Sequence, residues 1–159
     1  MKILVVSTPV FSLPVRGYAG LEYLTWKQAE GLAKLGHDVS IVAPDGSQCD
    51  GCTVIPIGVE RTVNEKMAYE KYWHLLPDFD VVIDSSWEKW SYILKMEGKL
   101  KAPILALLHA PVNTMYQEYP PVEKKCIVCI SQDQASHLKA LHNIDSRVCY
   151  NGCDTAFYK

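Results

Sequence analysis

The sequence predicts an α/β fold, an open parallel β-sheet with helices on both faces. Short apolar runs rich in β-branched residues alternate along the chain with segments whose apolar residues have helical spacing. Most of these runs are apolar at every position, which is typical of strands that are buried on both faces of a parallel sheet. The chain has 159 residues, 48% of them hydrophobic and 21% charged, which is enough for one buried core. We therefore expect a single domain over residues 1–150.

Three strands and one helix are predicted in the first part of the chain. The β-branched run at residues 2–7 indicates a buried strand. Apolar residues at positions 21–35 form one helical stripe, and Gly36 is placed to end this helix in the left-handed conformation. Two further strands are expected at residues 38–43 and 53–57.

The same alternation continues to the end of the domain. Helix-forming residues, or apolar residues with helical spacing, predict three more helices, at residues 64–76, 87–97 and 132–142. Short apolar runs predict four more strands, at residues 80–83, 103–108, 125–130 and 147–150. No internal repeat and no linker divides the chain before Asn151.

Composition argues against two classes of partner. Sixteen basic and 18 acidic residues give a net charge of -2, so the chain has no basic field to attract nucleic acid or an anionic membrane. The longest strongly apolar stretch, residues 102–112, falls well below the roughly 20 residues that cross a bilayer. The amino terminus has no apolar segment as long as a signal peptide's core. We expect no nucleic-acid binding, no membrane span and a cytoplasmic location.

Six cysteines include two CxxC pairs. Cys49 and Cys52 flank a turn, where they could be inert thiols, form a local disulfide or bind one metal ion. Cys126 and Cys129 lie in a predicted strand, where side chains three residues apart point to opposite faces and do not easily chelate a metal. We expect no metal site, and we expect Cys126, Cys129 and Cys149 to pack in the core.

Ligands of open parallel sheets bind at the carboxyl ends of the strands. Here the loop after the first strand, residues 7–20, carries only Gly17 and Gly20, so the tight G-x-G-x-x-G turn of dinucleotide-binding folds is missing. No G-x-x-x-x-G-K-[ST] motif occurs either, which excludes P-loop phosphate chemistry. A dinucleotide enzyme is therefore a weak alternative.

Several short motifs together resemble the amino-terminal half of GT-B glycosyltransferases of family 4. The long first loop ends in GYAGLE at residues 17–22, before an amphipathic helix that is followed by LGHDV at residues 35–39. Four further matches follow in the family's order: DVVID at 80–84, LLH at 107–109, CIS at 129–131, and YNGCD at 150–154 with Phe157. Two departures are the separation of Gly17 and Gly20, which many members have paired, and Ser85-Ser86, where many members place a histidine.

The resemblance implies a Rossmann-like, acceptor-side domain over residues 1–150, with residues 151–159 starting an interdomain junction. Such a domain belongs to a retaining, metal-independent glycosyltransferase that moves a sugar from a nucleotide-diphosphate sugar to a sugar, lipid or small-molecule acceptor. No cofactor is expected. The second GT-B domain, which in the family holds most donor contacts, is absent from these residues, so we expect the chain alone to fold but not to turn over. The alternative is a non-catalytic subunit of a two-chain glycosyltransferase.

The resemblance also assigns residues. It places His109 against the donor sugar as the catalytic residue, although a strand-end histidine can also cap a backbone carbonyl. Gly17 and Gly20 would let the donor diphosphate approach the helix amino terminus, which offers unpaired N–H groups; both could also be ordinary turn glycines. The expected acceptor-binding residues are Tyr18, Glu22, Trp87, Glu88, Asn113 and Tyr116. Glu22 could instead be a favourable first-turn acid, and Ser85 and Ser131 could cap the helices after them.

Overall fold

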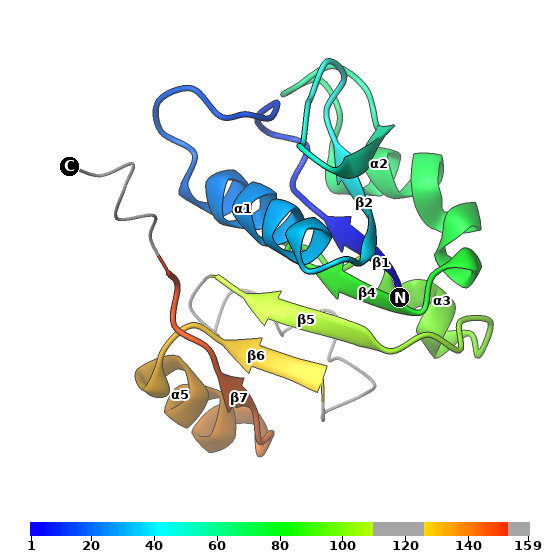
Figure 1. Ribbon diagram of the computed structural model, residues 1–159. Coiled ribbons are helices and arrows are strands. Elements are labelled where there is room, and N and C mark those ends of the chain that lie inside the picture. The colour runs from blue at the N-terminus through cyan, green and yellow to red at the C-terminus, as the bar shows by residue number, and fades with distance from the viewer. Residues whose placement is uncertain (110–125, 153–159) are drawn as a thin grey trace.

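The protein is an open, seven-stranded, all-parallel sheet with helices on both faces (Figure 1), as the sequence predicts. The computed structural model describes residues 1–109 and 126–152. The strands lie in the order β3-β2-β1-β4-β5-β6-β7. Their bounds are Lys2–Val6 (β1), Asp38–Ala43 (β2), Cys52–Pro56 (β3), Val81–Asp84 (β4), Ile104–Leu108 (β5), Ile127–Cys129 (β6) and Arg147–Val148 (β7).

Helices divide the core into two layers. Helix α1 (Gly20–Lys34) packs on one face of the sheet, where Ala29 covers β1 and β2 side chains such as Val5 and Ile41. The opposite face carries α2 (Glu65–Tyr72), the 3-10 helix η1 (Trp73–Asp78), α3 (Tyr92–Met96) and α5 (Gln132–His142). None of these described helices is long and apolar enough to cross a membrane.

The end of α1 follows the sequence prediction. Gly36 has φ 86° and follows the last helical turn. Its N–H donates to Ala33 O at 2.9 Å, and the next N–H, that of His37, donates to Leu32 O at 3.2 Å. This pair of hydrogen bonds is a Schellman motif, which satisfies carbonyls that the helix end leaves free.

Two predicted helices differ from the observed ones. The helix expected at 64–76 is α-helical only to Tyr72, and its last turn tightens into η1, which contains Pro77. The helix expected at 87–97 begins only at Tyr92. Residues 87–91 form a turn instead, because Lys89 adopts φ 54° and the Ser91 hydroxyl donates to the buried carboxylate of Asp84.

Smaller corrections concern the third strand, the last strands and the cysteines. β3 begins one residue before the predicted strand and ends one residue before its end. β6 and β7 are shorter than predicted. Cys129 is buried as expected, whereas Cys126 is only partly buried and Cys149 is exposed at the surface, so neither packs fully into the core.

Helix α5 begins and ends at the predicted residues. Ser131 caps it, as its Oγ accepts a hydrogen bond from Gln134 N at 3.1 Å. Gln134 returns the contact, because its Oε1 accepts from Ile130 N at 2.9 Å. Leu138 packs against Ile127 and Leu108 of the sheet. The helix is therefore fixed at its first turn and along one apolar stripe.

Truncation of Leu138 should destabilise the domain much more than truncation of Leu141 on the same helix. Leu138 is 0% exposed and Leu141 is 61% exposed. We expect Leu138→Ala to lower the free energy of unfolding by about 2–5 kcal/mol. Leu141→Ala should change it by less than about 0.5 kcal/mol. Urea unfolding followed by circular dichroism measures both, and equal losses would contradict this packing.

Candidate functional site

Three polar side chains follow adjacent strands at the carboxyl edge of the sheet. β1, β4 and β5 are neighbours, and Val6 pairs with Asp84, which pairs with Ala106. Ser7 and Ser85 therefore lie side by side, one residue beyond the paired positions, and His109 follows the end of β5. Because side chains alternate along a strand, all three continue the face that α1 covers.

The polar atoms at this edge are buried without partners. Ser7 Oγ, Ser85 Oγ and His109 Nε2 have no hydrogen-bond partner among the described residues. Buried polar groups in folded proteins are nearly always satisfied, and each exception asks for an explanation. A row of three such atoms on neighbouring strands is the pattern that a bound polar ligand would complete.

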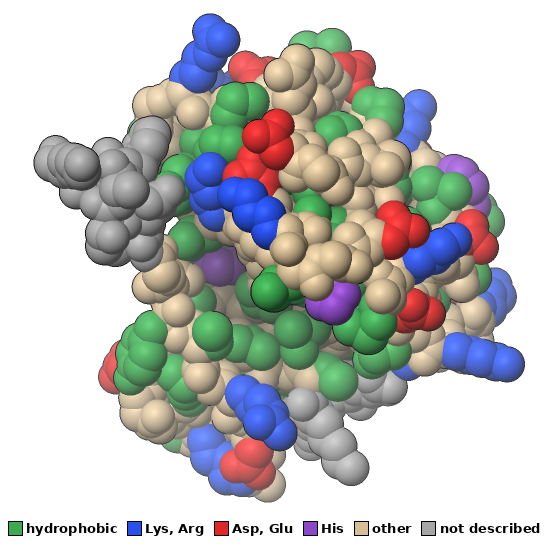
Figure 2. All heavy atoms as spheres, in the orientation of Figure 1, with side chains coloured by type: hydrophobic (Ala, Val, Ile, Leu, Met, Phe, Trp, Pro, Cys, Tyr) green, Lys and Arg blue, Asp and Glu red, His purple; other side chains and the backbone are tan. Residues whose placement is uncertain are grey.

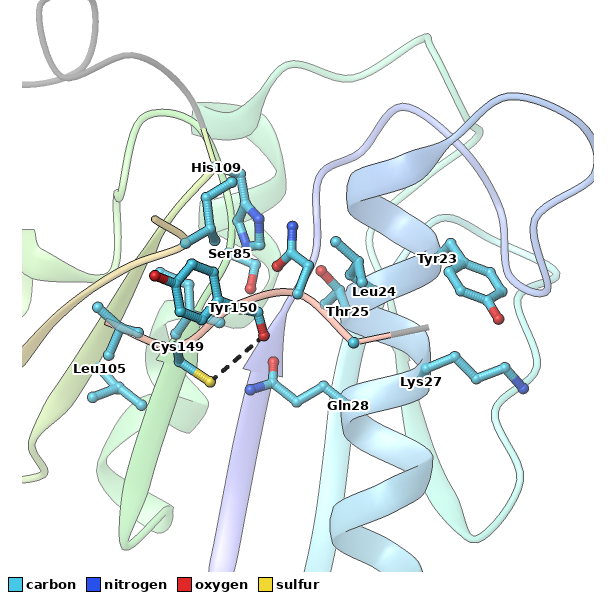
Figure 3. A pocket seen from close by; sticks show the side chains of 15 residues that line it. Tyr23, Leu24, Thr25, Lys27, Gln28, Ser85, Leu105, His109, Cys149 and Tyr150 are labelled. Carbon is cyan, nitrogen blue, oxygen red and sulfur yellow. Dashed lines mark hydrogen bonds between the residues drawn. The ribbon is translucent and has the colours of Figure 1, made fainter. Parts of the chain in front are cut away.

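Two of these residues line a cavity of about 440 Å³ beside α1. Figure 3 shows His109 and Ser85 close together on one side of it, with Leu24, Thr25 and Gln28 of α1 opposite. Figure 2 shows the molecule hollowed at this place, with hydrophobic side chains on one wall and lysine or arginine side chains on the other. The rest of the lining, most of it apolar, comes from β5, from β6 and the residue after it, and from the segment after β7: Leu105, Leu107, Val128, Ile130, Cys149, Tyr150, Asn151 and Gly152.

His109 is held in its neutral form. The pKa of its imidazole is lowered from the ordinary 6.5 to about 4, chiefly by burial and also by the positive charge of Lys89. At neutral pH the ring therefore offers one N–H donor and one nitrogen acceptor rather than a positive charge. This suits hydrogen bonding to a neutral polar group such as a hydroxyl.

The loop between β1 and α1 brings the helix amino terminus to the same edge. The Thr8 hydroxyl donates a hydrogen bond to the carboxylate of Glu22, and both side chains are buried. Glu22 thus joins the first turn of α1 to the end of β1. Its side chain is buried and is not exposed for contact with an acceptor substrate. Among the described residues no side chain caps α1, which begins at Gly20. Its first N–H groups are those that a helix leaves without intrahelical partners.

The remaining predicted residues of this loop are exposed. Gly17 has φ 82°, a left-handed conformation that favours glycine, and a Cβ at Gly17 or Gly20 would meet nothing within 4 Å. Tyr18 between them is 92% exposed. Both glycines thus present open backbone beside the start of α1.

The loop after β4 is held by the side chain of Asp84, the last residue of that strand, which is 0% exposed. Asp84 Oδ1 accepts hydrogen bonds from Ser86 N at 2.9 Å and Ser86 Oγ at 2.6 Å, and Oδ2 accepts from Ser91 Oγ. The amine of Lys89 lies 3.9 Å from Asp84 Oδ1 and also donates to Ser86 O. Burial lowers the pKa of Lys89, although Asp84 and Glu65 act in the opposite direction.

The two residues of this loop that the sequence predicts to bind the acceptor are placed differently from the serines beside them. Trp87 is 44% exposed and Glu88 is also exposed, whereas Ser85 and Ser86 are buried. Glu88 accepts a hydrogen bond from the indole N–H of Trp90, which packs partly buried against the α2 and α3 layer. Ser85 does not cap a helix, because its hydroxyl instead faces the cavity without a described partner.

Other predicted residues lie elsewhere. Asn113 and Tyr116 lie outside the described residues. Cys49 and Cys52 are free thiols in contact with each other, Cys49 donating, and burial raises the pKa of both. Among the residues that the structure describes, no three His, Cys, Asp or Glu side chains form a group able to hold a metal ion.

Comparison with known proteins identifies the family of the chain. In open α/β sheets, ligands bind at the carboxyl ends of the parallel strands, where this domain gathers its polar groups. The sequence profile of glycosyltransferase family 4 matches residues 18–157, so the chain belongs to that family. No curated protein matches the chain.

Two solved structures are similar. One is AviGT4, a glycosyltransferase involved in avilamycin A biosynthesis, with TM-score 0.63 and 21% identity over 99% of this chain and 44% of that chain. The other is the C-terminal domain of the coenzyme A biosynthesis bifunctional protein CoaBC, with TM-score 0.38 and 22% identity over 67% of this chain and 62% of that chain. The chain thus spans less than half the length of AviGT4, and its fold is that of the amino-terminal half of a GT-B glycosyltransferase.

Sequence reasoning missed several residues of the site. Thr25 and Gln28 of α1 line the cavity, but their spacing signals only a helix face. Ser7 and Ser85 could have been found, because they lie at or just beyond the ends of the buried strands predicted at residues 2–7 and 80–83. Lys89 and Glu65 carried no signal, since charged residues in predicted helices are ordinarily solvent-exposed.

The imidazole of His109 should titrate far below an ordinary histidine. We expect a midpoint of about 4 in NMR spectra of the ring protons. Because the unfolded chain binds this proton more tightly, the free energy of unfolding should fall as pH falls from about 6.5 to about 4. His109→Gln should flatten that dependence, and a midpoint near 6.5 would contradict the buried environment.

Proposed function

We propose that this chain is the acceptor-side domain of a retaining, metal-independent glycosyltransferase that takes its sugar from a nucleotide-diphosphate donor. The observation that carries the proposal is the cavity in which Ser85 and His109 present unsatisfied polar atoms beside the uncapped amino terminus of α1. Membership of glycosyltransferase family 4 supports glycosyl transfer as the chemistry of this site.

The donor diphosphate is proposed to lie at the amino terminus of α1. Free N–H groups and the positive end of the helix dipole favour a negatively charged group there. Gly17 and Gly20 support this placement, since neither has a side chain that would block a close approach and the space beside each is open. In the proposed reaction the leaving diphosphate is stabilised by these amides and by basic residues of a second domain.

The donor sugar is proposed to contact His109 and Ser85. A neutral imidazole and a hydroxyl can each donate and accept hydrogen bonds, which matches the hydroxyl groups of a sugar. Binding would satisfy atoms that are otherwise buried and unpaired, at Ser85 Oγ and His109 Nε2. A buried polar atom without a hydrogen-bond partner is costly, so a ligand that supplies the partner gains binding affinity.

The acceptor is proposed to lie over the loops after β1 and β4. Tyr18 and Trp87 give exposed aromatic surface and Glu88 gives a carboxylate at that edge. Aromatic surface with a few polar groups is typical of sites for sugars and other small organic acceptors. A sugar, a lipid headgroup or a small molecule would fit this description.

Turnover is proposed to require a second GT-B domain, supplied either in the same polypeptide or by a partner chain. A single domain offers an open ledge, whereas closure of two domains orients donor and acceptor and excludes water. The comparison with AviGT4, of which this chain matches 44%, supports the need for further residues. Either arrangement would act in the cytoplasm.

Substitution of His109 tests the proposal most simply. In the two-domain protein, screened with nucleotide-diphosphate sugars, His109→Ala should lower kcat/KM for transfer by about 10- to 1000-fold, because a buried polar contact to the sugar is lost. His74→Ala, at an exposed position on η1, is the matched control and should leave the rate unchanged. Normal turnover by His109→Ala would exclude the assigned role.

A further inference from the structure

A buried carboxylate joins α2 to the loop after β4. Glu65 is the first residue of α2, and its side chain is buried. Its Oε1 accepts a hydrogen bond from Trp87 N at 2.7 Å, and its Oε2 accepts one from Glu88 N at 2.6 Å. Two consecutive backbone amides, more than twenty residues away in sequence, are therefore held by the two oxygens of one carboxylate.

These two amides belong to the exposed part of the loop. Asp84 fixes Ser86, Ser91 and the amine of Lys89 on the buried side. Trp87 and Glu88 lie between these points, where their side chains turn outward. The carboxylate of Glu65 thus fixes the position of the backbone at Trp87 and Glu88, and with it the direction in which both side chains leave the loop.

We propose that Glu65 is a positioning residue for acceptor binding, which holds the backbone of Trp87 and Glu88 so that their side chains face the acceptor. The inference rests on the proposed function for the role of the acceptor. Glu65 itself does not touch the acceptor, because both of its oxygens are occupied by backbone N–H groups. Charge-assisted hydrogen bonds of this kind are stronger than neutral ones, which suits a rigid support.

The strength with which Glu65 holds these two amides should depend on pH near neutrality. The pKa of this carboxyl is raised from 4.5 to about 7. Burial is the main cause and the charge of Asp84 adds to it, whereas the hydrogen bonds from the two amides and the charge of Lys89 oppose the rise. The phenol of Tyr72, fully buried, also faces this group. An ionised carboxylate accepts both hydrogen bonds, but a protonated one carries its own hydrogen on one oxygen. The loop should therefore be held firmly above pH 7 and less firmly below it.

The test is a pH titration of backbone amide NMR shifts in the ¹⁵N-labelled chain. The amide protons of Trp87 and Glu88 should shift together with a midpoint at about pH 7, and Glu65→Gln should abolish this titration. The unsubstituted chain alone decides the first point, should the variant fold poorly. Absence of any titration at both amides, or its persistence in a folded Glu65→Gln variant, would overturn the inference.

Glu60 provides a matched control. Its carboxylate also accepts a backbone hydrogen bond, from Ser12 N at 2.8 Å, but at an exposed position. Glu60→Gln should move the amide signal of Ser12 and leave the titration of Trp87 and Glu88 intact. Loss of that titration in Glu60→Gln would show that it does not originate at Glu65.

A kinetic arm separates this inference from the proposed function. In a two-domain protein that transfers sugar, Glu65→Gln should raise the KM for the acceptor about tenfold, since one charge-assisted hydrogen bond is lost, and leave the KM for the donor unchanged. The pH dependence of the acceptor KM should vanish with it. An unchanged acceptor KM would overturn the inference alone, whereas no transfer from any nucleotide sugar would overturn the proposed function and leave the amide titration to decide the role of Glu65 in the loop.

Discussion

The buried carboxylate of Asp84 is the constraint on which the functional edge depends. A charged group that is fully removed from water is costly unless hydrogen bonds and an opposite charge compensate it. Asp84 obtains these from Ser86, Ser91 and Lys89, all within the loop that follows β4. Lys89 adopts a left-handed conformation, which directs its amine back toward Asp84. Helix α3 therefore begins only at Tyr92. The central strand of the sheet thereby dictates the shape of its own loop.

The same charge pair acts on the neighbouring strands. Lys89 helps to lower the pKa of His109 at the end of β5, so this imidazole stays neutral. Lys89 also lies near Glu65 of α2. Among the described residues, the edge then combines a neutral histidine, hydroxyls of Ser7 and Ser85 without hydrogen-bond partners, and the amino terminus of α1 without a side-chain cap. These groups would complement the proposed donor, which carries both a diphosphate and a sugar. Membership of glycosyltransferase family 4 supports that proposal.

The layered α/β fold could be predicted from sequence because it depends on local signals. Apolar runs marked the strands, and Gly36 and Ser131 marked helix ends that the structure confirms. The loop after β4 could not be predicted, since its turn depends on compensation of Asp84, a contact invisible in the pattern of residues 87–97. The position of His109 at the edge was predictable. The burial of its Nε2 without a partner among the described residues depends on packing, which the sequence does not show.

The central claim is that the carboxyl edge around β1, β4 and β5 is the donor-binding face. The most direct test maps a nucleoside diphosphate onto the ¹⁵N-labelled chain by NMR. The account predicts chemical-shift changes that saturate at millimolar ligand and cluster at Ser7, Gly20, Ser85 and His109, with Cys52 at the opposite end of the sheet unmoved. Shift changes that cluster at Cys52 and spare Ser85 and His109, or no change at all at millimolar ligand, would contradict it.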